Sequence, residues 1–288
     1  MSYNNKHLKG WIRVVVLLIF SVFFGNIFKL IGILIAGVDT QIPIHESSVY
    51  QLLIITFFDF IGTIAIIFIL LKILDNESIL NIGLKLKHRV SDILIGIITG
   101  FTIMGLATLF LVAIDNINFK AINFEFNNLV YAFLLFVFVA IKEEIVYRGY
   151  ILRNLMYSFN KYIALIASAI LFSLMHAMNP DVQYIQLLNL FLAGLLLGIS
   201  YIHNKNLWFP ISLHFSWNFF MSLLGLNASE NDPYSLIKFD DTGTNLINIG
   251  TYSFDKSYIY TILNVILIIC VFIWYRYKSE KMNSQVSS

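Results

Sequence analysis

Three short groups of polar residues interrupt the most apolar parts of this sequence. A carboxylate and an imidazole that face one water molecule can remove its proton and make it a nucleophile. A second imidazole and an amide can donate hydrogen bonds to the oxyanion that forms. Together these groups could hydrolyse an amide bond. The residues concerned are Glu143, Glu144 and Arg148; Phe172 and His176; and His214 and Asn218.

The spacing within each group suits an α-helix. Residues four apart share a helix face, so Glu144 and Arg148 are expected to form an ion pair. Glu143 points about 100° away, toward a different neighbour. His214 and Asn218 project from one face and can point at one spot. The alternative at each place is structural: a charge cluster that ends a helix, or a histidine hydrogen-bonded within the packing.

A register argument brings the first two groups together. If the helix with Glu143 continues to about residue 157 and the chain turns near Asn160, Glu143 and His176 each lie roughly 25 Å from the turn, since a helix rises ~1.5 Å per residue. The following helix then stops at Asn179-Pro180, within the depth of the membrane. Irregular backbone is tolerated there only beside a cavity, so this geometry also predicts water at the site.

The three motifs, E-E-x-x-x-R, F-x-x-x-H and H-x-x-x-N, occur in this order on separate hydrophobic segments. In this they resemble the CPBP family, which comprises type II CAAX prenyl endopeptidases and bacteriocin-processing or self-immunity proteins, also called Abi. The resemblance covers about residues 127–226. It implies an intramembrane endopeptidase that hydrolyses a peptide bond in a membrane-associated peptide or protein.

The resemblance also implies catalytic roles. Glu143 and His176 would activate water, while His214 and Asn218 would hold the oxyanion. Because these roles already use both histidines, we expect a mechanism without a cofactor. Zinc is the alternative, since a glutamate with two histidines could bind it and family members have been called metalloproteases.

The remaining motif positions are expected to support the site. Glu144 and Arg148 would form an ion pair that orients it, and Phe172 would flank His176. No motif position departs from the family pattern.

The composition predicts the elements that position these residues. Of the 288 residues, 58% are hydrophobic and 12% are charged, which is too apolar for a soluble domain. Apolar runs of roughly 20 residues indicate bilayer-spanning helices. We therefore expect an all-α polytopic membrane protein, one integral-membrane domain over 1–288, with about eight transmembrane helices and the site on the fourth, fifth and seventh. The expected spans are 11–36, 50–73, 92–114, 127–147, 161–178, 183–202, 207–226 and 258–276.

The distribution of basic residues predicts the orientation. Most lysines and arginines fall on the side of both termini; Lys120, Lys238 and Lys256 fall on the other side. Positive charge accumulates in cytoplasmic loops, so a multi-pass protein of the cell membrane with both termini cytoplasmic is expected. Its partners would be membrane lipid and a peptide or protein substrate that arrives from the cytoplasmic side. A net charge of only +2 gives no indication of nucleic-acid binding.

Two further charges lie within predicted spans. Lys29 is expected either to snorkel toward the interface or to pair with Asp59 across the first two spans, because an ionisable side chain inside a bilayer needs a partner or a route to water. Nothing near them in the sequence suggests chemistry. The single cysteine, Cys270, has no partner for an intramolecular disulfide.

Other protease classes fit less well. His45-Glu46 begins a zinc-protease string, but its fifth position is Val49. Gly198-Ile199-Ser200 is followed by a tyrosine where a serine protease of the membrane would need a small residue, and no G-x-G-D string supports an aspartyl site.

A non-enzymatic function is the main alternative. An immunity protein that shields the membrane from a peptide toxin, or a transporter with buried charges along its path, would also contain polar residues within spans. The sequence does not distinguish prenylated tails from a peptide pheromone or a bacteriocin precursor as substrate.

Overall fold

The computed structural model describes residues 9–39, 47–177, 182–226, 235–241 and 254–286. Its architecture is all-α, as predicted, and every expected span contains a helix. The first four helical segments are α1 (Gly10–Phe20) with α2 (Asn26–Ala36), α3 (Val49–Leu70), α4 (Val90–Ala113), and α5 (Phe126–Glu144). They are followed by α6 (Arg153–Leu155), α7 (Lys161–His176), α8 (Tyr184–Asn204), α9 (Trp208–Leu223) and α10 (Tyr258–Val286).

Five helical segments of the described chain are long and apolar enough to cross a membrane: 10–36, 49–75, 90–113, 184–204 and 258–277. The three helices that carry the motif residues, α5, α7 and α9, are not among them. Both α7 and α9 have 16 residues. At ~1.5 Å per residue each is about 24 Å long, which is shorter than the ~30 Å hydrocarbon layer. The five long apolar segments make the chain an integral membrane protein. The count of eight spans stays a prediction.

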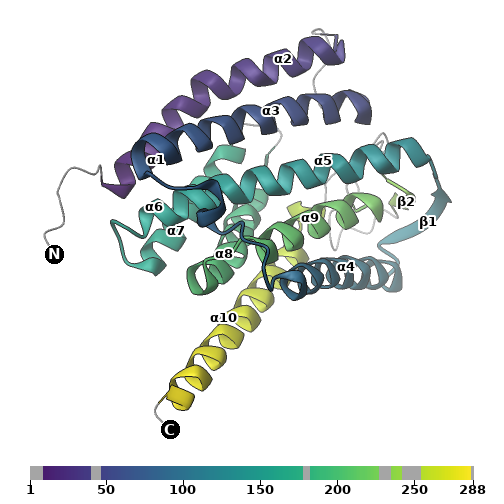
Figure 1. Cartoon of the computed structure of the whole chain (residues 1–288). Helices are drawn as coiled ribbons and strands as arrows, with labels where there is room; N and C mark the ends of the chain where they lie inside the picture. The colour runs from purple at the N-terminus through teal and green to yellow at the C-terminus, as the bar shows by residue number, and fades with distance from the viewer. Residues whose placement is uncertain (1–8, 40–46, 178–181, 227–234, 242–253, 287–288) are drawn as a thin grey trace, which may run out of the picture.

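Five helices form a row (Figure 1). In it α2 packs on α3, α3 on α5, α5 on α9, and α9 on α4. Helix α8 contacts α7, α9 and α10 and so joins the row to the remaining helices. Helices α5 and α9 therefore lie inside the row, whereas α7 packs on α8 and exposes large apolar side chains on its other face. Helices α2, α3, α4 and α10 also expose many large apolar side chains, as lipid-facing helices do.

Helices α4 and α9 approach each other closely because two glycines of α4 lie at the contact. A Cβ atom added to Gly96 would lie 2.1 Å from the Ser212 hydroxyl oxygen, and one added to Gly100 would lie 2.1 Å from that of Ser216. The Ser216 hydroxyl donates to the Gly96 carbonyl at 3.0 Å. Small residues that allow such contact are typical of helix packing in membranes. The contact fixes the position of α9, which carries His214.

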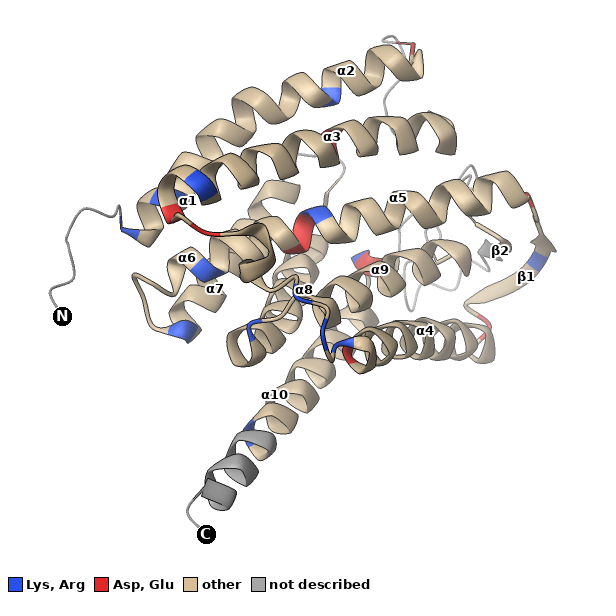
Figure 2. Cartoon of the chain, viewed as in Figure 1, with Lys and Arg blue, Asp and Glu red and all other residues tan. Residues whose placement is uncertain are grey.

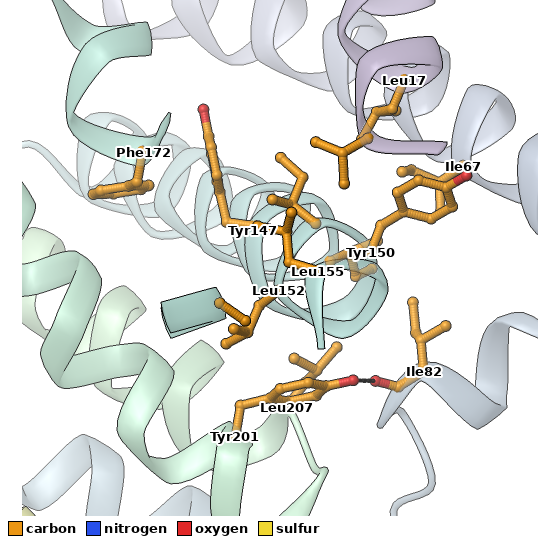
Figure 3. Close-up of a cluster of buried hydrophobic side chains, with 14 of the residues drawn as sticks. Leu17, Ile67, Ile82, Tyr147, Tyr150, Leu152, Leu155, Phe172, Tyr201 and Leu207 are labelled. Atoms are coloured by element: carbon orange, nitrogen blue, oxygen red, sulfur yellow. Dashed lines mark hydrogen bonds between the residues drawn. The ribbon is translucent and has the colours of Figure 1, made fainter. Parts of the chain in front are cut away.

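The interior is packed around the segment that follows α5 (Figure 3). Tyr150 and Leu152 are fully buried there, with Leu17 of α1 and Ile67 of α3 among the neighbours in the same hydrophobic cluster. The Tyr201 hydroxyl of α8 donates to the Ile82 carbonyl at 2.8 Å and ties α8 to the loop before α4. This close packing on both sides restricts movement of the segment after α5, which carries Arg148.

Charged residues concentrate at helix ends, including both signs at the end of α5, where it passes into the π-helical segment (Figure 2). One group, which we call the N-terminal ion cluster, joins α1, the end of the α3 segment and α6. Arg13 contacts Asp75 at 2.6 Å, and Arg153 lies 3.9 Å from Asp75 and 3.4 Å from Glu77. Opposite charges thus compensate one another where the first helices meet the rest of the bundle.

The loop after α9 contains a strand that the sequence analysis did not predict. Strand β2 (Ile237–Asp241) pairs antiparallel with β1 (Ile117–Ile122), which precedes α5. Both strands lie between expected spans, in segments for which the sequence analysis predicted no element.

Candidate functional site

The helix with the paired carboxylates changes its winding directly after them. Glu144 is the last residue of α5, and Ile145–Leu152 continue as π-helix into α6. The chain then turns, and Asn160 caps α7 by accepting a hydrogen bond from the Tyr162 amide at 2.9 Å. The predicted extension of this helix and the turn near Asn160 are confirmed. π-Helical turns within α-helices are often found at functional sites.

The expected ion pair is present and deeply buried. One Arg148 nitrogen (Nη1) donates to Glu144 Oε1 at 2.6 Å, and these side chains are 1% and 0% exposed. The other guanidinium nitrogen donates to the Gly194 carbonyl of α8 at 3.2 Å. The arginine therefore fixes the carboxylate of Glu144 and links α5 to α8.

His214 lies between the two carboxylates. Its Nδ1 is 2.8 Å from Glu144 Oε1, and its Nε2 is 3.8 Å from Glu143 Oε2. Because Glu144 is already paired with Arg148 and only accepts, Nδ1 donates to it. The contact with Glu144 thus determines the ring orientation and presents Nε2 to Glu143, the orienting arrangement that catalytic histidines commonly need.

His176 is oriented by its own helix. Its Nδ1 lies 2.8 Å from the Phe172 carbonyl, which can only accept, so Nδ1 carries the hydrogen. The neutral ring then has its lone pair on Nε2. The Phe172 ring packs against His176, with centroids 4.8 Å apart, and the Arg148 guanidinium lies 4.8 Å from the centroid of the same ring. Phe172 therefore connects the ion pair to the second histidine.

One cavity receives the residues that were expected to converge. It has a volume of about 150 Å³, enough for several water molecules, and Glu143, His176, His214 and Asn218 all line it. The walls are otherwise largely apolar. Other lining residues come from α5, α7, α8 and α9: Val139, Phe172, Leu190, Ala193, Leu196, Leu197, Leu213 and Trp217.

Helix α10 also contributes to this cavity, which the sequence analysis missed. Tyr260 and Asn264 line it, although we assigned the last span no role beyond its hydrophobicity. The available signal was Asn264 itself, an amide within an otherwise apolar span, where polar side chains are costly.

The expected pairing of Lys29 with Asp59 is wrong. Asp59 Oδ2 instead accepts from Lys142 Nζ at 2.6 Å, across the contact between α3 and α5. Helix packing brings α3 against α5, and Lys142 of α5 points toward Asp59. Lys142 directly precedes the motif carboxylates, so this pair holds α3 at the level of the site.

The cavity offers one acidic side chain and two imidazoles as possible metal donors: Glu143, His176 and His214. Within the described part of the chain, no group of three His, Cys, Asp or Glu side chains is arranged to hold a metal ion. The Nδ1 atoms of both site histidines are engaged by Glu144 and by a backbone carbonyl. A mechanism without a cofactor stays a prediction.

His45, Glu46 and Asn179-Pro180, named in the sequence analysis, lie outside the described residues.

The region that contains the site matches a known protein family. Residues 125–220, from the start of α5 to most of α9, match the family described as Rce1-like, type II CAAX prenyl endopeptidase. The match confirms the resemblance drawn from the three motifs and nearly coincides with the expected 127–226. No curated protein and no solved structure matches the chain.

Proposed function

We propose that this chain, a member of the CAAX protease family by its Rce1-like region at residues 125–220, is an intramembrane endopeptidase that hydrolyses a peptide bond in a membrane-associated peptide or protein. The observation that carries the proposal is the cavity of about 150 Å³ in which one carboxylate, two imidazoles and one amide face the same space. A packed structural cluster would leave no room for water or substrate.

Water activation is assigned to Glu143 and His176. The Glu143 carboxylate accepts a proton from water while the water oxygen attacks the carbonyl carbon of the scissile bond. His176 accepts a hydrogen bond from the same water at Nε2, because its Nδ1 hydrogen is engaged by the Phe172 carbonyl. The proton taken by Glu143 then passes to the leaving amine nitrogen when the carbon–nitrogen bond breaks.

Oxyanion stabilisation is assigned to His214 and Asn218. When protonated, His214 donates from Nε2, while its Nδ1–H remains held by Glu144 at 2.8 Å. Asn218 lies one helical turn further along α9 and lines the same cavity, so its amide can donate from the same face.

Glu144, Arg148 and Phe172 act as positioning residues. Arg148 fixes Glu144, Glu144 orients His214, and Phe172 contacts both the guanidinium and His176. Hydrogen bonds that lock a catalytic side chain in its working orientation are a general requirement of such sites.

Access and orientation belong to the same proposal. The chain lies in the cell membrane with both termini in the cytoplasm, and the peptide arrives from that side. Support comes from the basic residues, most of which fall on the side of both termini. The substrate is a peptide segment able to enter a largely apolar cavity.

The test compares the peptides of cells that carry wild-type protein or Glu143→Ala. We expect peptides with new termini in the wild type alone, and cleavage of the corresponding synthetic peptide by purified protein in proteoliposomes. Identical peptide profiles would contradict the proposal. Protection from a toxin that persists in a folded Glu143→Ala variant would favour an immunity protein, and flux of intact substrate would favour a transporter.

Metal dependence has a separate test. We expect purified protein to remain active after treatment with a chelator. Stoichiometric zinc in active protein, with activity lost on chelation and restored by zinc, would overturn the assignment of both histidines to hydrolysis.

A further inference from the structure

Helix α10 lies outside the Rce1-like region, yet it forms one wall of the cavity. Tyr260 and Asn264 are four residues apart and line the cavity together with Trp217 of α9. The Tyr260 and Trp217 rings meet edge to face, with centroids 5.4 Å apart and planes at 81°. The cavity therefore has a second polar region, built from residues that play no part in the proposed hydrolysis.

Two polar atoms of this region are unusual. Asn264 is 0% exposed and Trp217 is 6% exposed. The Tyr260 side chain lies close enough to interact with both, but Asn264 Oδ1 and Trp217 Nε1 make no hydrogen bond of standard distance and angle with a described residue. The Asn264 amide nitrogen donates to the Tyr260 carbonyl at 3.0 Å, which leaves Oδ1 as an acceptor. Each unsatisfied buried group costs about 1–3 kcal/mol, so a compensating role is expected.

The position of α10 is fixed by polar contacts with α8. Asn189 donates to the carbonyls of Asp255 at 2.7 Å and Ser257 at 3.2 Å, and its own carbonyl oxygen accepts from Thr261 at 2.6 Å. Gln186 donates to the Asp255 carboxylate at 2.6 Å. These contacts surround the start of α10. The hydrogen bonds to α8 therefore fix the positions of Tyr260 and Asn264 at the cavity.

We propose that Trp217 and Asn264 form a specificity subsite for a substrate side chain that carries an amide or a hydroxyl group. An indole N–H that needs an acceptor and a carbonyl oxygen that needs a donor are complementary to Asn, Gln, Ser or Thr, each of which both donates and accepts. The inference rests on the proposed peptide hydrolysis.

The test uses full-length protein in proteoliposomes and a synthetic peptide library randomised at each position. We expect the wild type to cleave with a preference for Asn, Gln, Ser or Thr at one position beside the scissile bond. Asn264→Leu removes the acceptor at similar volume and is expected to reduce that preference about tenfold, the effect of one lost hydrogen bond. Trp217→Phe removes the donor but keeps an aromatic ring and is expected to reduce it as well.

The matched control is Ser222→Ala on α9. The Ser222 hydroxyl is also buried without a hydrogen-bond partner among the described residues, but it does not line the cavity. Its preference profile should equal that of the wild type.

The outcomes separate the two proposals. Wild-type cleavage with the same profile in Asn264→Leu and Trp217→Phe would overturn the subsite and leave the hydrolysis intact. That result together with a lower melting temperature in both variants would indicate a trapped structural water. If Asn264→Leu does not fold, Trp217→Phe carries the test alone. If the wild type cleaves no more than Glu143→Ala, both proposals fail.

Discussion

Two groups of buried charge, the N-terminal ion cluster and the candidate site, both pair a carboxylate with an arginine but differ in their surroundings. In the first, Asp75 lies between Arg13 and Arg153, and none of these residues lines the cavity. In the second, Glu143 and His214 do line it. Charge buried among hydrophobic helices therefore indicates structure as readily as chemistry, and access to a cavity is what separates the two.

The largest expected effect is a loss of cleavage rate when a carboxylate of the candidate site is replaced. Glu143→Gln keeps the shape of the side chain and removes its basicity, so the rate of peptide cleavage should fall by about 10³-fold or more. The melting temperature should stay within a few degrees of the wild type. The matched control is Asp75→Asn, the same carboxylate-to-amide change in the N-terminal ion cluster. Cleavage within tenfold of the wild type in Glu143→Gln would contradict the assigned role.

The second effect separates position from chemistry within the site. Arg148→Met leaves the Glu144 carboxylate buried without its cation, so the free energy of unfolding should fall by roughly 3–5 kcal/mol. Activity should fall as well, because His214 loses its fixed orientation. Reversible unfolding in mixed micelles measures the first quantity, and initial cleavage rates of the folded fraction measure the second. Unchanged stability would contradict the burial of this ion pair in the protein interior.

A smaller effect is expected in the N-terminal ion cluster. Asp75→Asn removes the charge that Arg13 and Arg153 share, and the free energy of unfolding should fall by about 2 kcal/mol, the usual range for a hydrogen bond to a charged group. The cleavage rate of the folded protein should not change. A loss of activity greater than the loss of folded protein would place this cluster in the mechanism and erase the contrast with the site.

The smallest effect concerns the Lys142 and Asp59 pair. These side chains are 20% and 25% exposed, so their attraction is weaker than that of the fully buried pair formed by Glu144 and Arg148. Asp59→Asn should change the free energy of unfolding by less than about 1 kcal/mol. A shift as large as that of Arg148→Met would show that lipid, rather than polar solvent, surrounds the exposed part of the pair.

Much of the fold could be predicted because its determinants are local. Hydrophobic segments identify helices by length and composition, and the four-residue spacing of Glu144 and Arg148 predicted their contact. The turn near Asn160, assumed in the register argument, is present, and Asn160 caps the helix that follows it. These features depend on residues close together in the chain.

What could not be predicted depends on packing between distant helices. The partner of Asp59 was wrong because Lys142 lies 83 residues away and only the contact of α3 with α5 brings it near. The same reason concealed Tyr260 and Asn264, whose helix follows a long loop. The π-helical turns after Glu144 had no signal in the residue pattern, because they arise from how Ile145–Leu152 fit between their neighbours.

The glycines of α4 take no part in the proposed reaction, but they determine how closely α9 packs against α4. A single methyl group at Gly100 would meet backbone and side-chain atoms of α9 within 3 Å, and α9 would have to move away. Because His214 and Asn218 are carried on that helix, the displacement would be passed on to them without any change in the chemical groups themselves. The small residues of α4 thus set the distance between α4 and α9. A larger residue at Gly100 is expected to give a protein that inserts stably into the membrane but is inactive.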